Sequence, residues 1–97
     1  MTVYQARELI QTNYKNRPLN QSLVKFIARD ILEGNFDKNT YIILDQFGNL
    51  KYGQHTISAI ILANKDLDVN VLQDGEKLYD STINKNSKYE KLYRVLY

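Results

Sequence analysis

The chain has 97 residues, of which 43% are hydrophobic and 25% are charged, as expected for one folded domain with a modest core. Its 13 basic and 11 acidic side chains give a net charge of +2, which is too balanced to indicate nucleic-acid binding from charge alone. Without cysteine and with one histidine, the chain cannot form disulfides, thiolate active sites, sulfur-based zinc sites or histidine-rich metal centres.

The first third of the chain predicts two helices separated by a turn. Thr2 can cap a first helix, and the turn-forming residues 13–18 end it. Asn20 or Ser22 can cap a second helix, which Gly34 closes at its C-terminus. The apolar residues of the second helix recur at helical spacing: Leu23, Val24, Ile27, Ala28, Ile31 and Leu32.

The next segment predicts a β-hairpin. Tyr41–Leu44 is rich in β-formers and is typical of a buried strand, and Leu50–Tyr52 is a short returning strand. Between them Asp45 is the first residue of the turn, and Gly48 is free to take a positive φ.

An apolar helix follows the hairpin directly. Gly53 breaks the strand pattern, and residues 56–63 predict a helix that is too apolar on all sides to lie at the surface. The only histidine, His55, falls at the start of this helix, where unpaired N–H groups attract anions. This segment is therefore a candidate seat for a phosphate or a nucleotide.

The C-terminal part predicts a strand at residues 69–72, a turn at Asp74-Gly75, a polar loop and a last helix. Ser87 and Glu90 have the spacing of a capping box for that helix. One of its faces carries an apolar and aromatic stripe, formed by Tyr89, Leu92, Tyr93 and Leu96. The stripe either docks on the domain's own core or faces a partner, which includes a second copy of the chain.

Together these elements predict one domain over residues 1–97, with a core at about 14–75 and a C-terminal loop and helix at 76–97. The expected fold class is α/β in the broad sense, and more narrowly α+β, with a short mixed sheet and packed helices. The sequence has no signal-peptide pattern and no apolar run of membrane-spanning length, so we expect a cytoplasmic protein without a membrane partner.

Three stretches of the sequence carry a likeness to a known family. They are Asn16-Arg17-Pro18 before a helix, Asp30-Ile31-Leu32-Glu33-Gly34-Asn35-Phe36 at that helix's end, and residues 43–59 with Gly53-Gln54-His55-Thr56. In these stretches the chain resembles the ParB/sulfiredoxin-like superfamily, most closely its phage and bacterial members with a GQHR-L-x-A motif. The resemblance implies that family's fold, and a glycine turn whose polar residues and helix N–H groups meet the phosphate of a nucleotide.

The chain departs from this family pattern at three points. Thr56 replaces the arginine that normally follows the histidine, so one neutral hydroxyl stands in place of a charged fork of donors. Tyr52 replaces the acidic residue that is common before the motif glycine. The absence of cysteine excludes sulfiredoxin chemistry. We therefore expect binding without efficient catalysis, and a nuclease or nucleotide hydrolase is the least favoured interpretation.

The predicted ligand site consists of Gly53, Gln54, His55, Thr56 and Arg17, with no catalytic residue, cofactor or metal. His55 either contacts a phosphate or caps the helix and bonds a nearby backbone carbonyl. Thr56 is interpreted as a helix cap rather than a nucleophile, because no second base is evident. Arg17 either reaches the ligand or forms a surface salt bridge.

Two further groups of charged residues have ordinary explanations beside their functional ones. The carboxylates Asp30, Glu33, Asp37 and Asp45 are scattered along the sequence, and we interpret them as solvated rather than as a metal or acid–base site. Basic residues alternate with tyrosines near the C-terminus and form either a nucleic-acid surface or a solvated loop and helix. These residues are Lys77, Lys85, Lys88, Lys91 and Arg94, with Tyr79, Tyr89 and Tyr93.

Two functions follow from these patterns. The leading hypothesis is a small phage-type binding module that holds a nucleotide or a DNA or RNA phosphate at a helix N-terminus. The alternative is a protein-interaction or inhibitor protein, of the kind that phages and mobile elements use against host defences, on a degraded ParB-like scaffold. Its contacts would include the tyrosine stripe, either with a protein partner or in a homodimer.

Overall fold

The computed structural model describes residues 1–12, 18–73 and 86–96. Within these ranges the chain forms four helices and a three-stranded mixed sheet, which confirms the predicted α+β class. None of the helices in the described ranges is both long and apolar enough to cross a membrane. The elements in chain order are α1 (Val3–Ile10), α2 (Gln21–Glu33), β1 (Tyr41–Leu44), β2 (Leu50–Tyr52), α3 (Gln54–Ala63), β3 (Asn70–Gln73) and α4 (Lys88–Leu96).

The first two helices begin at capping residues that the sequence predicted. The Thr2 hydroxyl accepts a hydrogen bond from the Gln5 N–H (3.0 Å), and the Gln5 side chain accepts one from the Thr2 N–H (2.8 Å). For α2 the cap is Asn20, whose side-chain oxygen accepts from the Leu23 N–H at 3.0 Å. Gly34 ends α2 in the left-handed conformation, with φ of 76°.

The predicted hairpin is confirmed, and Asp45 organises its turn. One carboxylate oxygen of Asp45 accepts hydrogen bonds from the N–H groups of Phe47 and Asn49, each at 2.9 Å. Gly48 takes a positive φ of 84°, as predicted. β1 pairs with β2 in antiparallel fashion and with β3 in parallel, so the strand order is β2-β1-β3. The hairpin tip holds Phe47 with 78% of its surface exposed.

The third helix begins two residues earlier than predicted. Gly53 itself is the N-cap of α3, with φ of 109° and no side-chain cap, so the prediction that Thr56 caps this helix is wrong. The reason is steric, because a Cβ at position 53 would lie only 3.0 Å from Ile42 Cγ1 on β1. Glycine lets the chain turn sharply beside β1 and enter the helix at once. β3 also begins one residue later than predicted, at Asn70. The predicted turn at Asp74-Gly75 lies outside the described residues.

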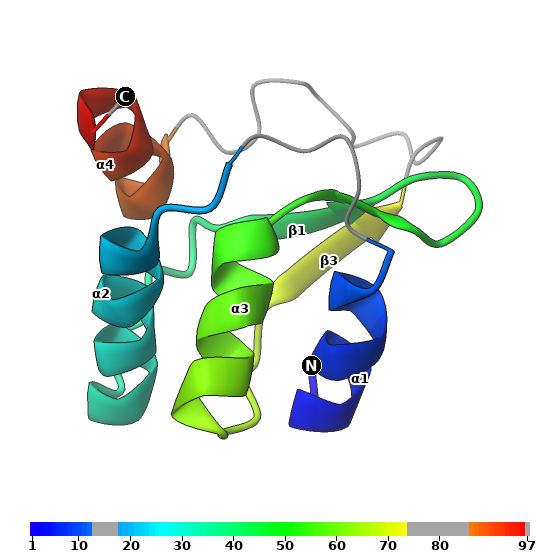
Figure 1. Ribbon diagram of the computed structural model, residues 1–97, viewed down its shortest axis with the longest axis horizontal. Helices are drawn as coiled ribbons and strands as arrows, with labels where there is room; N and C mark the ends of the chain where they lie inside the picture. Colours follow the sequence, from blue (N-terminus) through cyan, green and yellow to red (C-terminus); the bar gives the residue numbers. More distant parts are fainter. Residues whose placement is uncertain (13–17, 74–85, 97) are drawn as a thin grey trace.

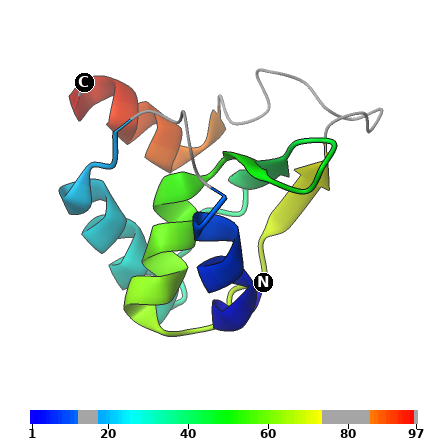
Figure 2. The same cartoon turned by 45° about the vertical axis from the view of Figure 1, so that its right-hand side comes forward.

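Helices α1, α2 and α3 lie side by side on one face of the sheet, with α3 in the middle (Figure 1). This central position explains the apolar sequence of α3, since Ile57, Ala59 and Ile60 are fully buried. Helices α2 and α3 begin at the same end of this layer, and α4 lies at that end (Figures 1 and 2). The predicted ligand motif is at the start of α3, at the same end of this layer as α4.

Candidate functional site at the start of helix α3

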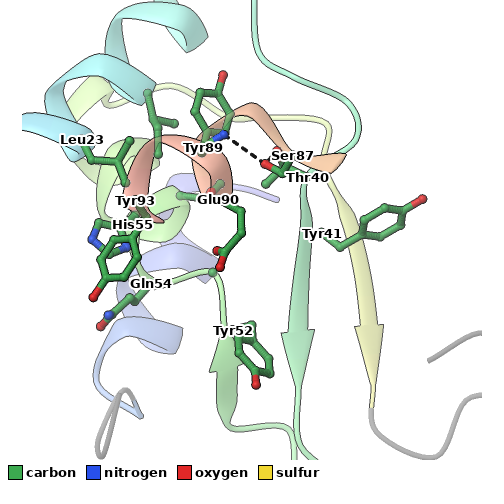
Figure 3. A pocket seen from close by; sticks show the side chains of 13 residues that line it. Leu23, Thr40, Tyr41, Tyr52, Gln54, His55, Ser87, Tyr89, Glu90 and Tyr93 are labelled. Carbon is green, nitrogen blue, oxygen red and sulfur yellow. Dashed lines mark hydrogen bonds between the residues drawn. The ribbon is translucent and has the colours of Figure 1, made fainter. Parts of the chain in front are cut away.

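Four of the five predicted ligand residues meet at a small cavity between α3 and α4. Gly53, Gln54, His55 and Thr56 line it from the α3 side, and the space has a volume of about 50 Å³. We call it the α3 cavity (Figure 3). Its other described lining residues are Leu23, Ile27, Thr40, Tyr41, Tyr52, Ser87, Tyr89, Glu90 and Tyr93. The fifth predicted residue, Arg17, lies outside the described part of the chain.

The motif side chains are enclosed by the protein itself. Gln54, His55 and Thr56 have only 5%, 6% and 3% of their surface exposed. A cavity of this volume has room for a few water molecules and is too small for a nucleotide. In the described part of the chain, the side chains of Gln54, His55 and Thr56 are therefore largely shielded from an external phosphate.

His55 joins the start of α3 to the start of α2. Its Nε2 atom accepts a hydrogen bond from the backbone N–H of Asn20 at 3.0 Å. This nitrogen must therefore carry a lone pair and no proton. A backbone carbonyl was one of the two partners expected for His55, but its observed backbone partner is an N–H. The imidazole ring also meets the Tyr93 ring edge-on, with 5.2 Å between centroids.

A buried tyrosine and a buried carboxylate fasten α4 to α2. The Tyr89 hydroxyl donates a hydrogen bond to Asp30 Oδ2 at 2.8 Å and accepts one from the Asp37 N–H at 3.1 Å. The Lys88 ammonium group lies 2.8 Å from the same carboxylate oxygen. Asp30 has 5% of its surface exposed, so the prediction that it is solvated is wrong. One sequence signal was available, because Asp30 falls three residues after Ile27 and seven after Leu23, on the apolar face of α2.

The environment of Tyr89 keeps its hydroxyl neutral. Burial is the largest effect that raises the pKa of Tyr89, and the hydrogen bond to Asp30 and its negative charge raise it further. The N–H of Asp37 acts in the opposite direction and lowers this pKa. The ring packs against Phe36 and Phe26, with centroid distances of 5.4 Å and 6.4 Å. Tyr89 thus combines an apolar anchor with a hydrogen-bond donor that keeps its proton at neutral pH.

Polar contacts also fix the beginning of α4. Asp37 Oδ2 accepts a hydrogen bond from the Lys88 N–H at 2.7 Å. The hydroxyl oxygens of Ser87 and Thr40 lie 2.6 Å apart, and the Ser87 hydroxyl also accepts from the Tyr89 N–H at 3.3 Å. Ser87 therefore occupies the predicted capping position and at the same time bonds to the residue before β1.

The predicted interaction stripe lies largely against the domain itself. Tyr89 and Tyr93 are buried, and Leu92 is half-buried and packs on the core. The side chain of Leu96 is outside the described part of the structure. A partner can reach the two tyrosines only if α4 leaves this position. Of the basic residues predicted near the C-terminus, Lys88, Lys91 and Arg94 are exposed on α4.

Glu90 is the only charged side chain among the described residues that line the α3 cavity. It points from α4 into this space (Figure 3), and its carboxylate lies 3.6 Å from the Arg94 guanidinium. The first turn of a helix carries a partial positive charge, which a carboxylate nearby complements. No group of three or more metal-ligating side chains occurs within residues 1–12, 18–73 and 86–96.

No protein family, characterised protein or solved structure matches this chain.

Proposed function

We propose that this chain is a protein-interaction module without enzymatic activity, of the inhibitor kind that phages and mobile elements carry, on a ParB-like plan. The observation that carries the proposal is that the expected phosphate seat is filled by the protein's own side chains. His55 is engaged by Asn20 and Tyr93, and Gln54 and Thr56 are buried beside it. A scaffold whose ligand motif is used internally is free to act through its outer surface.

The hairpin tip is the surface that we propose for this contact. Phe47 is 78% exposed, and its backbone N–H and that of Asn49 both donate to Asp45, which fixes the turn. A large aromatic side chain on a rigid turn loses little entropy on binding, which is typical of interface anchors. Beside it lies a groove of about 620 Å³ between α1 and the sheet. Its lining residues are Met1, Gln5, Glu8, Leu9, Thr12, Leu44, Gly48 and Val71.

Replacing this anchor tests the proposal. The wild-type chain, Phe47→Ala and Val95→Ala are immobilised side by side and exposed to the same bacterial extract. Val95 is the matched control, because it is 83% exposed but lies on α4. We expect a specific partner that Phe47→Ala binds about 30-fold more weakly, the effect of losing an anchor worth about 2 kcal/mol. A partner that binds all three chains equally, or no specific partner at all, would contradict the proposal.

The position of Glu90 favours a second candidate function, which is phosphate binding at the start of α3 once α4 has moved. In this structure a carboxylate lines the cavity where a phosphate was expected. With Thr56 in place of arginine the donors are neutral, and each hydrogen bond from them to a charged phosphate contributes at most about 1.5–3 kcal/mol. Binding of a nucleotide or of DNA would therefore be weak.

Titration with CTP, ATP and short DNA tests this candidate, with the amide signals of residues 53–58 followed by NMR. Glu90→Gln should bind more tightly than the wild type, because the neutral amide competes less well for the positive end of α3. Glu8→Gln is the control, because Glu8 is exposed on α1, and it should leave the titration unchanged. Absence of any shift at millimolar ligand in both wild type and Glu90→Gln would eliminate this function.

A further inference from the structure

The buried polar side chains of the described chain are gathered at one place. Six are buried, and all of them lie where α4 meets the rest of the domain: Asp30, Thr40, Gln54, His55, Thr56 and Ser87. Asp30 bonds to Tyr89 and Lys88, and the other five line the α3 cavity that α4 closes. The junction of α4 therefore combines the aromatic contacts of Tyr89 and Tyr93 with all six buried polar side chains, whereas the remainder of the described core is apolar.

The apolar core depends little on α4. Among the buried hydrophobic residues of the described chain, α4 contributes only Tyr89 and Tyr93. The others belong to α1, α2, α3, β1 and β2 and pack around the fully buried Ile27, Ile42, Ile57 and Ile60. Removing α4 would thus leave most of this cluster covered by its present neighbours.

The polarity of the junction bears on how easily it opens. Polar groups that lose an internal partner can bond to water instead, so separating a polar junction costs less than exposing an apolar core. Contacts within a protein that open and close are accordingly more polar than permanent ones. Segments with few buried apolar contacts also open at lower free energy than the core.

We propose that α4 is a detachable lid. The hydrogen bond between Tyr89 and Asp30 holds it closed, and its opening presents Gln54, His55 and Thr56 as one polar surface while α1, α2, α3 and the sheet stay folded. The proposal does not rest on the contact at the hairpin tip, and it concerns the protein without any ligand. Phosphate binding at α3, the second candidate function above, requires this opening, so the lid controls the access of a phosphate.

The single histidine is a natural reporter of the open state. Diethylpyrocarbonate acylates an unprotonated, accessible imidazole nitrogen, and Nε2 of His55 is buried in the closed state. The lid can be locked with the double substitution Thr40→Cys and Ser87→Cys, since the two hydroxyl oxygens already touch at 2.6 Å and the cysteine sulfurs would take their places. The natural chain has no cysteine, so no other disulfide competes.

With the disulfide formed, we expect His55 to react slowly with diethylpyrocarbonate. Reduction of the disulfide in the same protein should raise the rate of His55 acylation at least about tenfold, as for a local opening equilibrium. Without the lock, Tyr89→Phe should react faster than the wild type, whereas Tyr52→Phe, a half-exposed tyrosine on the same cavity, should not. Equal His55 rates in the oxidised and reduced protein would overturn the proposal.

Hydrogen exchange gives a second test that needs no substitution. The amide of Lys91, which bonds to the Ser87 carbonyl at 3.2 Å in the first turn of α4, should exchange faster than the amides of the buried α2 residues Ile27 and Ala28. Its exchange should also depend less on denaturant, because a local opening exposes less surface than global unfolding. If the α4 and α2 amides exchange at one rate with one denaturant dependence, α4 is a permanent part of the core and no lid exists.

Discussion

Replacing Tyr89 by phenylalanine removes one oxygen atom from the junction of α4 and α2 and leaves the ring packing in place. Two hydrogen bonds disappear, one donated to the Asp30 carboxylate at 2.8 Å and one accepted from the Asp37 N–H at 3.1 Å. A bond to a charged acceptor contributes about 1.5–3 kcal/mol, and a neutral one about 1 kcal/mol. Asp30 keeps its contact with Lys88, and phenylalanine is the more hydrophobic residue, so both effects reduce the loss. We expect α4 docking to weaken by about 2–3 kcal/mol.

Hydrogen exchange at the Lys91 amide measures this change directly. A loss of 2–3 kcal/mol in the free energy of α4 docking corresponds to amide exchange from α4 that is about 30- to 150-fold faster in Tyr89→Phe than in the wild type. The control is Tyr4→Phe, since Tyr4 is 71% exposed, and its hydrogen bond to Glu8 lies in solvent. That substitution should change no exchange rate by more than about twofold, the range of ordinary surface substitutions. If the Lys91 amide exchanges at the same rate in Tyr89→Phe as in Tyr4→Phe, the hydrogen bond to Asp30 does not hold α4, and the reasoning above is wrong.

Three further predictions concern stability in urea. Burial raises the pKa of Tyr89 above its ordinary 10.0, so on raising the pH the unfolded chain loses this proton before the folded chain does. The stabilisation that the protonated Tyr89 gives to the fold is therefore complete below pH 10. Above pH 10 the free energy of unfolding falls by up to about 1.4 kcal/mol per pH unit. The stability difference between wild type and Tyr89→Phe should therefore narrow from pH 10 to 11, and a constant difference refutes this. Gly53→Ala should cost about 3 kcal/mol, because φ is 109° and the new Cβ meets Ile42 at 3.0 Å; Gly34→Ala, with open space around it, should cost only about 1 kcal/mol. Asp45→Ala should cost about 1–2 kcal/mol through its two turn hydrogen bonds, and Asp45→Asn, which keeps an acceptor oxygen, should cost clearly less.

Local patterns predicted most of the secondary structure of this chain. The caps at Thr2 and Asn20, the end of α2 at Gly34 and the Asp45 turn all depend on contacts within four residues, so the sequence around each position contains the necessary information. Local patterns placed the start of α3 too late in the sequence. Its true position depends on Ile42, which lies on β1, eleven positions before Gly53.

The candidate site required contacts that no local pattern contains. Asp30 is buried because Tyr89, 59 residues later, bonds to it, and His55 is engaged because Asn20, 35 residues earlier, donates to it. The sequence by itself determined the helices, the hairpin and two separate groups of candidate residues, the motif at Gly53 and the tyrosine stripe. Only the tertiary structure decided that the two groups face each other across one small cavity. Burial is set by what the rest of the chain brings to a residue, and that depends on how distant segments pack.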